Sequence, residues 1–384
     1  MRIVHVAIRF PPAEGGGEQV VYNLAKQQVK MENEVYVITT NLMKEVPREV
    51  DKTLPTKEVM NDINVIRMKT YPTGLPVWGY GSIFFGLKKL LNEIKPDIVH
   101  THSYGYFHSD VLARLRKKSE WKLVMTSHGF TPGRGIFRYV KKIYDKSIGK
   151  RTVKNIEAGI AISKKDKEIF ERLGAKNIYI IPNGIELSKF EGLPDKNVFR
   201  NKYNVKGKMI LNVSRLSRIK GHAFLIEAFS RIVKEFPDTT LVIVGEDWGE
   251  LMHLKKLVKR LNLGDRVIFT GKIPEKYLLG AYSSADVFVL CSIEEPFGIV
   301  LLEAMASSVP IVSTNRGGPP EVIVECGLLV EPNPIAIYDG ICKLLREASL
   351  RNKFIESGKK RVLEFTWKKT AEKNMKVYRE TLNL

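Results

Sequence analysis

Short apolar runs alternate with longer amphipathic segments along most of this 384-residue chain. Helix-length patterns such as Glu18–Lys30 and Ile136–Val153 separate the apolar runs of the first half. Those runs are Ile3–Ile8, Val35–Thr39, Ile63–Met68, Ile98–His102, Leu123–Thr126, Ala158–Ile162 and Tyr179–Ile181. Apolar strands that alternate with helices are typical of βαβ units around a buried parallel sheet. The pattern therefore predicts an α/β fold.

The same pattern restarts after a polar, turn-rich break near Ser188–Asn204. The later runs are Met209–Val213, Thr240–Val244, Arg266–Thr270, Val287–Leu290 and Pro310–Ser313. The chain is longer than one hydrophobic core normally supports, so two doubly wound domains are expected. We predict a first domain over 1–187, a linker over 188–204 and a second domain over 205–365. Residues 366–384 read as one helix.

Composition excludes some classes of protein. No apolar run approaches the roughly 18 residues of a membrane span, and the first eight residues are too short for a signal peptide, so a cytoplasmic protein is expected. The cysteines Cys291, Cys326 and Cys342 lack metal-ligand spacing, and the scattered histidines give no metal site. The net charge of +20 favours anionic partners, but no nucleic-acid recognition motif accompanies it.

The most specific motif is Glu-Pro-Phe-Gly-Ile-Val-Leu-Leu-Glu-Ala-Met-Ala at 295–306, directly after an apolar run. It predicts a helix that opens near Phe297, Gly298 and Ile299. The free amide groups of a helix start form a site for a diphosphate, and glycine lets it approach closely. Glu303 then lies within reach of ribose hydroxyls, and Glu295 lies where it could hold sugar hydroxyls.

A second motif, Val-Ser-Arg-Leu-Ser-Arg-Ile-Lys-Gly at 213–221, ends the first apolar run of the second domain. Arg215 and Lys220 could converge on one anion there, the first through a planar fork and the second as a point charge. A third motif is glycine-rich, Glu-Gly-Gly-Gly-Glu at 14–18, and lacks the spacing of a dinucleotide-binding loop.

The paired glutamates of the 295–306 motif resemble the signature of the retaining family-four glycosyltransferases (glycosyl transferases group 1). The resemblance extends over essentially the whole chain and is loosest in residues 40–95. It implies the GT-B architecture, in which two Rossmann-like domains face each other and the C-terminal helix crosses back to the first domain. It assigns Arg215 and Lys220 to the donor diphosphate, where they neutralise the leaving nucleotide without a metal ion or another cofactor.

The resemblance also assigns residues that the motifs alone leave open. It places His128 near the transferred sugar, Gly16 and Gly17 beside the donor phosphate and the acceptor, and the backbone of Ile273 at the nucleotide base. For His102 a structural role and a site role are both left open, whereas His5 and His100 are interpreted as structural. Two departures from the family pattern are Ser308, where members usually have glycine, and the loop Gly245–Gly249, where Trp248 could stack on the base or cover a surface.

The sequence therefore predicts a retaining, metal-independent hexosyltransferase that takes sugar from a UDP- or GDP-sugar to a glycan or lipid-linked acceptor. Its catalytic residues are expected to be Glu295, His128, Arg215 and Lys220. A disaccharide phosphorylase or a nucleotide-sugar epimerase on the same architecture is the alternative enzyme, and a nucleic-acid-binding protein is the alternative from another class. The basic segment Arg134–Lys154 reads either as a solvated helix or as a peripheral contact with an anionic membrane.

Overall fold

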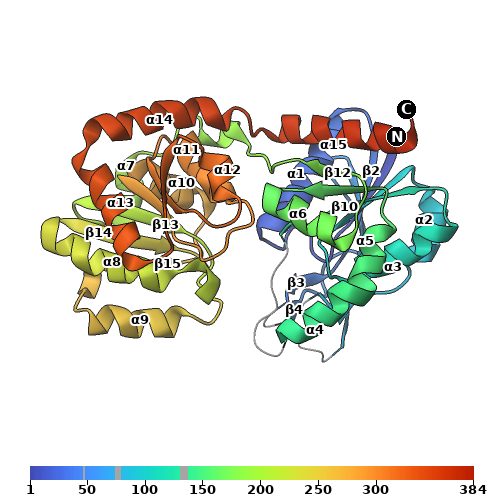
Figure 1. Cartoon of the computed structure of the whole chain (residues 1–384), viewed down its shortest axis with the longest axis horizontal. Coiled ribbons are helices and arrows are strands. Elements are labelled where there is room, and N and C mark those ends of the chain that lie inside the picture. The colour runs from blue at the N-terminus through green and yellow to red at the C-terminus, as the bar shows by residue number, and fades with distance from the viewer. Residues whose placement is uncertain (46–47, 74–78, 130–136) are drawn as a thin grey trace. The chain divides into compact units, whose positions relative to one another are not determined.

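A computed structural model describes residues 1–45, 48–73, 79–129 and 137–384. The chain forms two compact units, each built on its own sheet (Figure 1). Unit 1 comprises Met1–Gly184 and Trp367–Leu384, and unit 2 comprises Ile185–Thr366. None of the helices in the described residues is long and apolar enough to cross a membrane.

The sheet of unit 1 has eight strands in the order β12-β11-β10-β9-β1-β2-β6-β5, and all neighbours are parallel except β5 and β6. The predicted apolar runs form β1 (Arg2–Val6), β2 (Glu34–Thr40), β6 (Ile63–Met68), β9 (Ile98–His102), β10 (Lys122–Thr126), β11 (Ala158–Ala161) and β12 (Ile178–Ile180). The edge strand β5 (Lys57–Met60) was not predicted, because its exposed Lys57 and Val59 alternate with half-buried residues instead of forming an apolar run.

The helices of unit 1 cover its sheet. They are α1 (Gly16–Lys30), α2 (Leu87–Ile94), α3 (Phe107–Leu115), α4 (Phe137–Tyr144), α5 (Lys150–Lys154), α6 (Lys164–Leu173) and α15 (Trp367–Leu382). Short strand pairs β3 (Leu42–Lys44) with β4 (Glu49–Val50) and β7 (Tyr71–Pro72) with β8 (Ser82–Ile83) lie outside the main sheet. The C-terminal helix α15 contacts α1 and β10, and its Met375, Val377 and Tyr378 join the core beside Ile3 and Ile98. The predicted return of this helix to the first domain is confirmed.

The sheet of unit 2 is wholly parallel, with the order β15-β14-β13-β16-β17-β18. Its strands are β13 (Lys208–Val213), β14 (Thr239–Val244), β15 (Val267–Gly271), β16 (Val287–Leu290), β17 (Ile311–Thr314) and β18 (Gly327–Val330). Its helices are α7 (Lys196–Tyr203), α8 (His222–Glu235), α9 (Leu251–Arg260), α10 (Glu275–Ser284), α11 (Ile299–Ala306), α12 (Pro319–Ile323), α13 (Pro334–Arg346) and α14 (Ala348–Val362). The two parallel-sheet domains confirm the predicted fold class.

The segment 188–204, predicted as a linker, is structured. It carries part of a 3₁₀ turn, Leu187–Phe190, and the helix α7, which packs against α10 of unit 2. The buried ring of Phe199 anchors α7, and Gly280 of α10 leaves room for it. The helix was not predicted, because Phe199 is its one buried residue and the rest of the segment is largely polar.

Strand order locates a crevice in each sheet. In each sheet the strand order reverses at the first strand. The next strands of the chain lie on one side of it, and a later strand lies on the other side: β9 beside β1 in unit 1, and β16 beside β13 in unit 2. Loops leave neighbouring strands in opposite directions at such a point, and ligands of parallel sheets bind in the crevice at the carboxyl ends of the strands. Residues that follow these four strands are therefore the first candidates for a site.

Ser308 lies at the end of α11, where its backbone has a φ of 59° in the left-handed region. Glycine adopts this conformation without strain, which agrees with the glycine that the family resemblance leads one to expect at this turn. The departure at Ser308 is therefore a backbone effect at a helix end.

Candidate functional site

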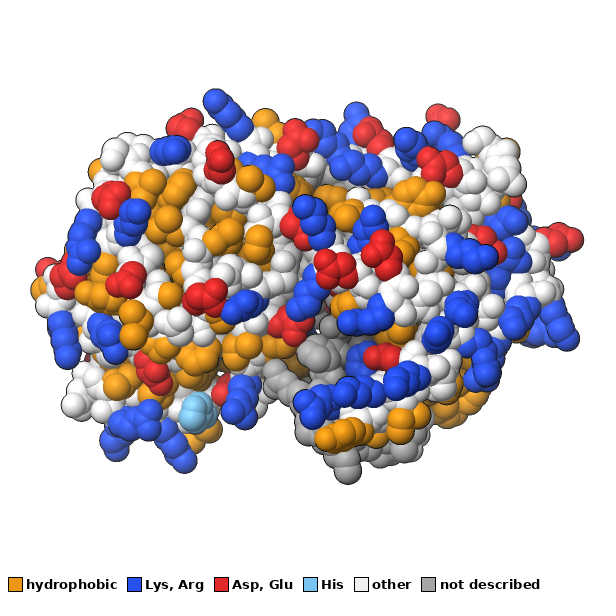
Figure 2. Space-filling model, in the orientation of Figure 1, with side chains coloured by type: hydrophobic (Ala, Val, Ile, Leu, Met, Phe, Trp, Pro, Cys, Tyr) orange, Lys and Arg blue, Asp and Glu red, His pale blue; other side chains and the backbone are white. Residues whose placement is uncertain are grey.

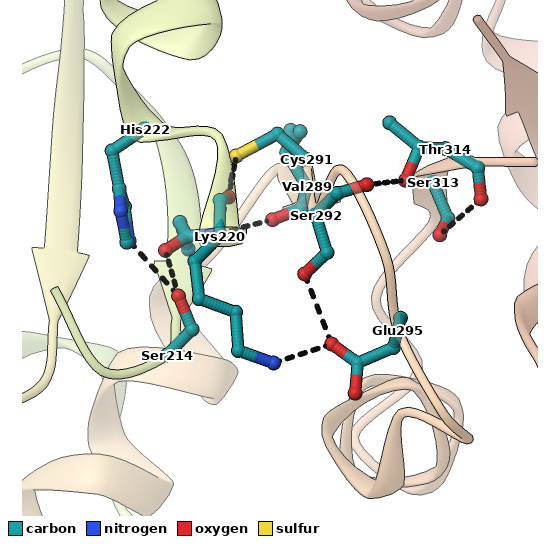
Figure 3. Close-up of polar contacts among 10 residues, drawn as sticks. Ser214, Lys220, His222, Val289, Cys291, Ser292, Glu295, Ser313 and Thr314 are labelled. Atoms are coloured by element: carbon teal, nitrogen blue, oxygen red, sulfur yellow. Dashed lines mark hydrogen bonds and ion pairs between the residues drawn. The ribbon is translucent and has the colours of Figure 1, made fainter. Parts of the chain in front are cut away.

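Lys220 and Glu295 meet at the crevice of unit 2. Lys220 follows β13, Glu295 follows β16, and the Lys220 Nζ atom lies 2.6 Å from Glu295 Oε2 (Figure 3). Ser292 Oγ donates a second hydrogen bond to the same oxygen at 2.9 Å. Both charged side chains are largely buried, with 15% and 10% of their surface exposed. Two residues that the sequence assigned separately, one to phosphate and one to sugar, thus form one ion pair.

The loops that carry this pair are bonded to each other. Cys291 Sγ donates to the backbone oxygen of Lys220 at 3.1 Å, and the amide of Ile293 donates to the oxygen of Ile219 at 2.8 Å. Gly221 has a φ of 69°, and a Cβ atom there would lie 2.0 Å from the Cys291 oxygen, so only glycine fits. Burial raises the pKa of the Cys291 thiol to about 12, which agrees with a structural cysteine.

The Gly317–Gly318 turn holds the other side of Glu295. The Gly318 amide donates to the Glu295 backbone oxygen at 2.8 Å, and a Cβ atom on Gly317 would lie 2.0 Å from that oxygen. Thr314 Oγ1 at the end of β17 donates to the backbone oxygen of Ser292 at 2.6 Å (Figure 3). Glu295 is therefore positioned by two neighbouring strand ends.

Arg215 lies near the end of the same strand as Lys220, and its guanidinium stacks on the ring of Trp248 at 4.1 Å. The indole Nε1 of Trp248 donates to Glu246 at 3.2 Å. Cation–π stacking of this kind restrains a guanidinium without using its hydrogen-bond donors. From the sequence, Trp248 was interpreted as stacking on the nucleotide base or covering a surface. Neither interpretation included this contact with Arg215, the predicted phosphate-binding arginine.

Helix α11 begins immediately beyond Glu295. Phe297 is buried, Gly298 precedes the helix with a φ of 89°, and Ile299 is the first helical residue. In the described part of the chain no side chain caps this helix start, which leaves amide groups of the first turn available to an anion. The sequence placed the helix start at these residues, and their assignment to a diphosphate remains a prediction.

Glu303 lies farther along α11, and its Oε2 atom accepts a hydrogen bond of 2.6 Å from the hydroxyl of Tyr282 in α10. Burial raises the pKa of the Glu303 carboxyl. Tyr282 was missed by sequence reasoning, because a tyrosine within an amphipathic helix carries no motif. Ile273, predicted at the nucleotide base, is half-buried in the turn between β15 and α10.

In unit 1 the glycine-rich loop follows β1 and opens α1. Gly16 and Gly17 are exposed, and a Cβ atom on either would meet no atom of the described residues within 4 Å. Gly15 differs, because a Cβ atom there would lie 2.3 Å from Glu18, whose carboxylate pairs with Arg9 at 2.6 Å. A side chain at Gly15 would therefore have to displace the Glu18 carboxylate, whereas the described residues leave the surface beside Gly16 and Gly17 open.

His128 follows β10 with a left-handed φ of 52°. Its Nε2 atom lies 2.8 Å from Nδ1 of His102, and Nε2 of His102 lies 2.9 Å from Nδ1 of His5. Burial lowers the pKa of His128 to about 4, so its ring is neutral near pH 7. The sequence left the role of His102 open and gave no sign that His5 and His128 would contact it.

Comparison with known proteins agrees with this architecture. The family model described as Glycosyl transferases group 1 matches residues 195–361, and the model Glycosyltransferase Family 4 matches residues 14–189. An uncharacterized glycosyltransferase of Methanocaldococcus jannaschii is 31% identical over 407 residues, which cover 100% of this chain and 99% of that protein.

Two solved structures are similar in fold. Sucrose-phosphate synthase from Thermosynechococcus elongatus has a TM-score of 0.82 at 24% identity, covering 100% of this chain and 99% of that one. HepE of Anabaena in complex with UDP has a TM-score of 0.80 at 20% identity, covering 99% and 100%. With its two parallel-sheet domains and its full-length relative, the chain belongs to the group 1 glycosyltransferases and has their GT-B fold.

Proposed function

We propose that this glycosyltransferase takes a hexosyl group from a UDP- or GDP-sugar and binds that donor at the crevice of unit 2. The observation that carries the proposal is the Lys220–Glu295 pair at the ends of β13 and β16, next to the uncapped start of α11. A cation and free amide groups suit a diphosphate, and a carboxylate beside them suits sugar hydroxyls. The bound UDP of the HepE structure supports this class of donor.

The rest of the donor follows along the same edge. Arg215, restrained by Trp248, adds a second cation for the diphosphate, and Glu303 accepts hydrogen bonds from ribose hydroxyls. The backbone at Ile273 contacts the base. In unit 1, Gly16 and Gly17 let phosphate or acceptor approach the backbone of α1, because no side chain of the described residues lies near either position.

Transfer proceeds with retention of the anomeric configuration. The acceptor oxygen attacks the anomeric carbon from the face that the diphosphate leaves, the bond from that carbon to the phosphate oxygen breaks, and the departing phosphate takes the acceptor proton. Lys220, Arg215 and the start of α11 stabilise the charge that develops on the leaving diphosphate. His128 and Glu295 hold hydroxyl groups in place, so that the chain contributes positioning and charge stabilisation.

Two cations and a helix start can balance the diphosphate without a metal ion. Transfer is therefore expected to persist after exhaustive EDTA treatment. Loss of transfer that manganese or magnesium restores would contradict this part of the proposal.

The donor is identified by a thermal-shift panel of nucleoside-diphosphate sugars, followed by product analysis with the sugar that raises Tm most. A retained anomeric configuration in the product is expected. Transfer that requires a sugar 1-phosphate instead would identify a phosphorylase, and conversion of the nucleotide sugar without any acceptor would identify an epimerase.

The surface of α4 favours a lipid-linked acceptor. Tyr139, Val140 and Ile143 are 58%, 43% and 68% exposed, and cationic side chains including Lys142 and Lys146 flank them. Figure 2 shows hydrophobic side chains beside a row of Lys and Arg over this helix. Only part of the predicted basic segment lies here, because Arg134 and Ile136 fall outside the described residues.

We infer that α4 adsorbs to an anionic membrane surface that presents the acceptor. Each Lys or Arg near such a surface contributes about 1 kcal/mol, screened by salt. Co-sedimentation with vesicles that contain acidic lipid should be salt-sensitive, and it should fall when Lys142, Lys146 and Lys150 become glutamine. Lys141 is left unchanged, because it pairs with Asp145 at 2.8 Å. Equal recovery in the supernatant with and without acidic lipid would favour a glycan acceptor in solution.

A further inference from the structure

A row of buried polar groups crosses the centre of unit 1. It begins at Gln28 of α1, whose Oε1 atom lies 2.6 Å from Nε2 of His5 in β1. It continues through His5 Nδ1 and His102 Nε2 at 2.9 Å, and through His102 Nδ1 and His128 Nε2 at 2.8 Å. Gln28, His5 and His102 are at most 2% exposed, whereas His128 at the end of the row is half-buried. The row thus leads from the core to the surface beside the crevice.

Three of the neighbouring rings, those of His5, His100 and His102, have nitrogen atoms within 4.8 Å of one another, which suggests a metal site. The ring nitrogens are already engaged, however. His100 Nδ1 lies 2.6 Å from the Tyr378 hydroxyl and His100 Nε2 lies 2.7 Å from Thr126 Oγ1. Both nitrogens of His5 and of His102 are in the row itself. These contacts describe a hydrogen-bond network in which a metal would have to displace several bonds.

The row has a direction. A neutral imidazole offers one donor and one acceptor, so each link fixes the next. With Gln28 Oε1 as the acceptor of the first link, His5 Nε2 carries the proton and His5 Nδ1 accepts from His102 Nε2. His102 Nδ1 then accepts from His128 Nε2. His128 is left with a bare Nδ1 atom, which has no hydrogen-bond partner among the described residues.

Gln28 itself is held at both ends. Its Nε2 atom donates to the Tyr378 hydroxyl at 3.2 Å, and Tyr378 in turn meets His100. Turning the amide over would therefore require both arms of the network to reverse together. Burial lowers the pKa of His5 to about 4 and the pKa values of His100 and His102 well below 6.5, so the rings stay neutral near pH 7.

We propose that Gln28 is a positioning residue that fixes the tautomer of His128, with the proton on Nε2 and Nδ1 as a hydrogen-bond acceptor. Resting on the proposed function, this assigns His128 to a hydroxyl group of the sugar or the acceptor. A bare ring nitrogen accepts from a hydroxyl, whereas it repels the oxygen atoms of a phosphate, which need a donor. His128 therefore selects the hydroxylated end of the substrate.

The first test uses the unmodified protein. ¹⁵N-histidine labelling with NMR detection of both ring nitrogens at neutral pH distinguishes a bare from a protonated Nδ1, and the signal that disappears in His128→Gln assigns His128. A bare Nδ1 with protonated Nε2 is expected. A protonated Nδ1 on His128 would overturn the proposal. The measurement needs no transfer activity, so a bare Nδ1 in a protein that binds no nucleotide sugar would contradict the proposed function alone.

The second test removes the hydrogen bonds of Gln28 at the buried end of the row. Gln28→Met removes both hydrogen-bonding groups at similar side-chain length, and it should give His128 a mixture of tautomers. The matched control is Thr126→Val, which removes the last partner of the other arm, beside His100, and should leave the His128 spectrum unchanged. Turnover is expected to fall by about tenfold in Gln28→Met with the donor KM unchanged, the effect of losing one neutral hydrogen bond.

A purely structural role of Gln28 would lower the stability of Gln28→Met without altering the tautomer of His128. An unchanged His128 spectrum in Gln28→Met, or equal tautomer mixing in the two variants, would therefore overturn the proposal. If Gln28→Met fails to fold, His5→Phe, which breaks the next link of the same arm, takes its place with the same expected spectrum.

Discussion

The two units share the arrangement of strands around the crevice but differ in the chemistry at the carboxyl ends of those strands. Unit 1 places neutral rings there, linked by hydrogen bonds from Gln28 to His128. Unit 2 places charges there, in the Lys220–Glu295 pair and the Arg215–Trp248 stack. The same arrangement of strands therefore supports two kinds of site. In unit 1 burial keeps the histidine rings neutral, and in unit 2 ion pairing and stacking stabilise charged side chains. The two should respond differently to acid and to loss of charge.

Acid should separate the two units most. Five of the seven histidines lie in unit 1, and burial lowers the pKa of each, to about 4 for His5, His108 and His128. Unfolded histidine takes a proton near pH 6.5, so the unfolded chain binds more protons below that value and stability falls as the pH drops. By pH 5 the cost is roughly 2 kcal/mol for each such histidine.

Unit 2 has one histidine of this kind, His222, whose pKa burial also lowers to about 4. Hydrogen exchange followed by mass spectrometry at pH 7 and pH 5 should therefore show a loss of protection several kcal/mol larger in unit 1 than in unit 2. An equal loss in both sheets would mean that the histidine network is not what sets acid stability.

Loss of the cation at the ionic site should have the next largest effect. Lys220→Ala removes a charge-assisted contact of about 1.5–3 kcal/mol and leaves the largely buried Glu295 without its partner. Transfer and nucleoside diphosphate affinity should both fall by about 10- to 100-fold. Lys359→Ala is the matched control, because Lys359 pairs with Glu356 at 2.8 Å on the exposed surface of the same unit. Equal losses in the two variants would remove Lys220 from the donor site.

Neutralising the other partner should sharpen the comparison. Glu295→Gln leaves Lys220 with its charge but without an anionic partner, so nucleoside diphosphate affinity should stay equal or rise slightly. Turnover should fall by about tenfold, because the carboxylate that holds sugar hydroxyls is lost. Glu303→Gln makes the same chemical change at the ribose position and should mainly weaken nucleotide binding. Calorimetry and steady-state kinetics compare the two, and the reverse pattern would exchange their roles.

The smallest effect is expected at Trp248. Trp248→Leu removes the ring beneath Arg215 and should weaken nucleoside diphosphate binding by about 1 kcal/mol, or roughly fivefold. The effect should vanish when Arg215 is already alanine, since the ring acts through the guanidinium. Additive losses in this double-mutant cycle would show that Trp248 contacts the nucleotide directly.

Local patterns predicted most of the fold. The apolar runs located seven strands of the first sheet and five of the second, because continuous burial leaves a continuous hydrophobic signature. They missed β5 and β18, whose strands are only partly buried. They also gave no sign of α7, because a single buried phenylalanine anchors that helix.

The site was predictable only as separate motifs. The 295–306 string and the Lys220 loop could each be interpreted alone. Their contact depends on β13 and β16 being neighbours, which the sequence does not reveal for two residues that lie 75 positions apart. The histidine row is a stronger case, because its members come from four segments with no common motif. Trp248 shows the same limit, since its partner is set by the turn between β14 and α9.

The return of α15 to unit 1 also sets an order of events during synthesis. Tyr378, which completes the bonding of Gln28 and His100, is made after all of unit 2. At about 5–20 residues per second, the ribosome needs roughly 10–40 s to pass from Gly184 to Tyr378. During that interval the core of unit 1 lacks the side chains that α15 contributes to it. The domain that begins folding first is therefore the last to finish, and a nascent chain stalled within unit 2 would expose Ile3 and Ile98 to the chaperones that bind apolar surfaces.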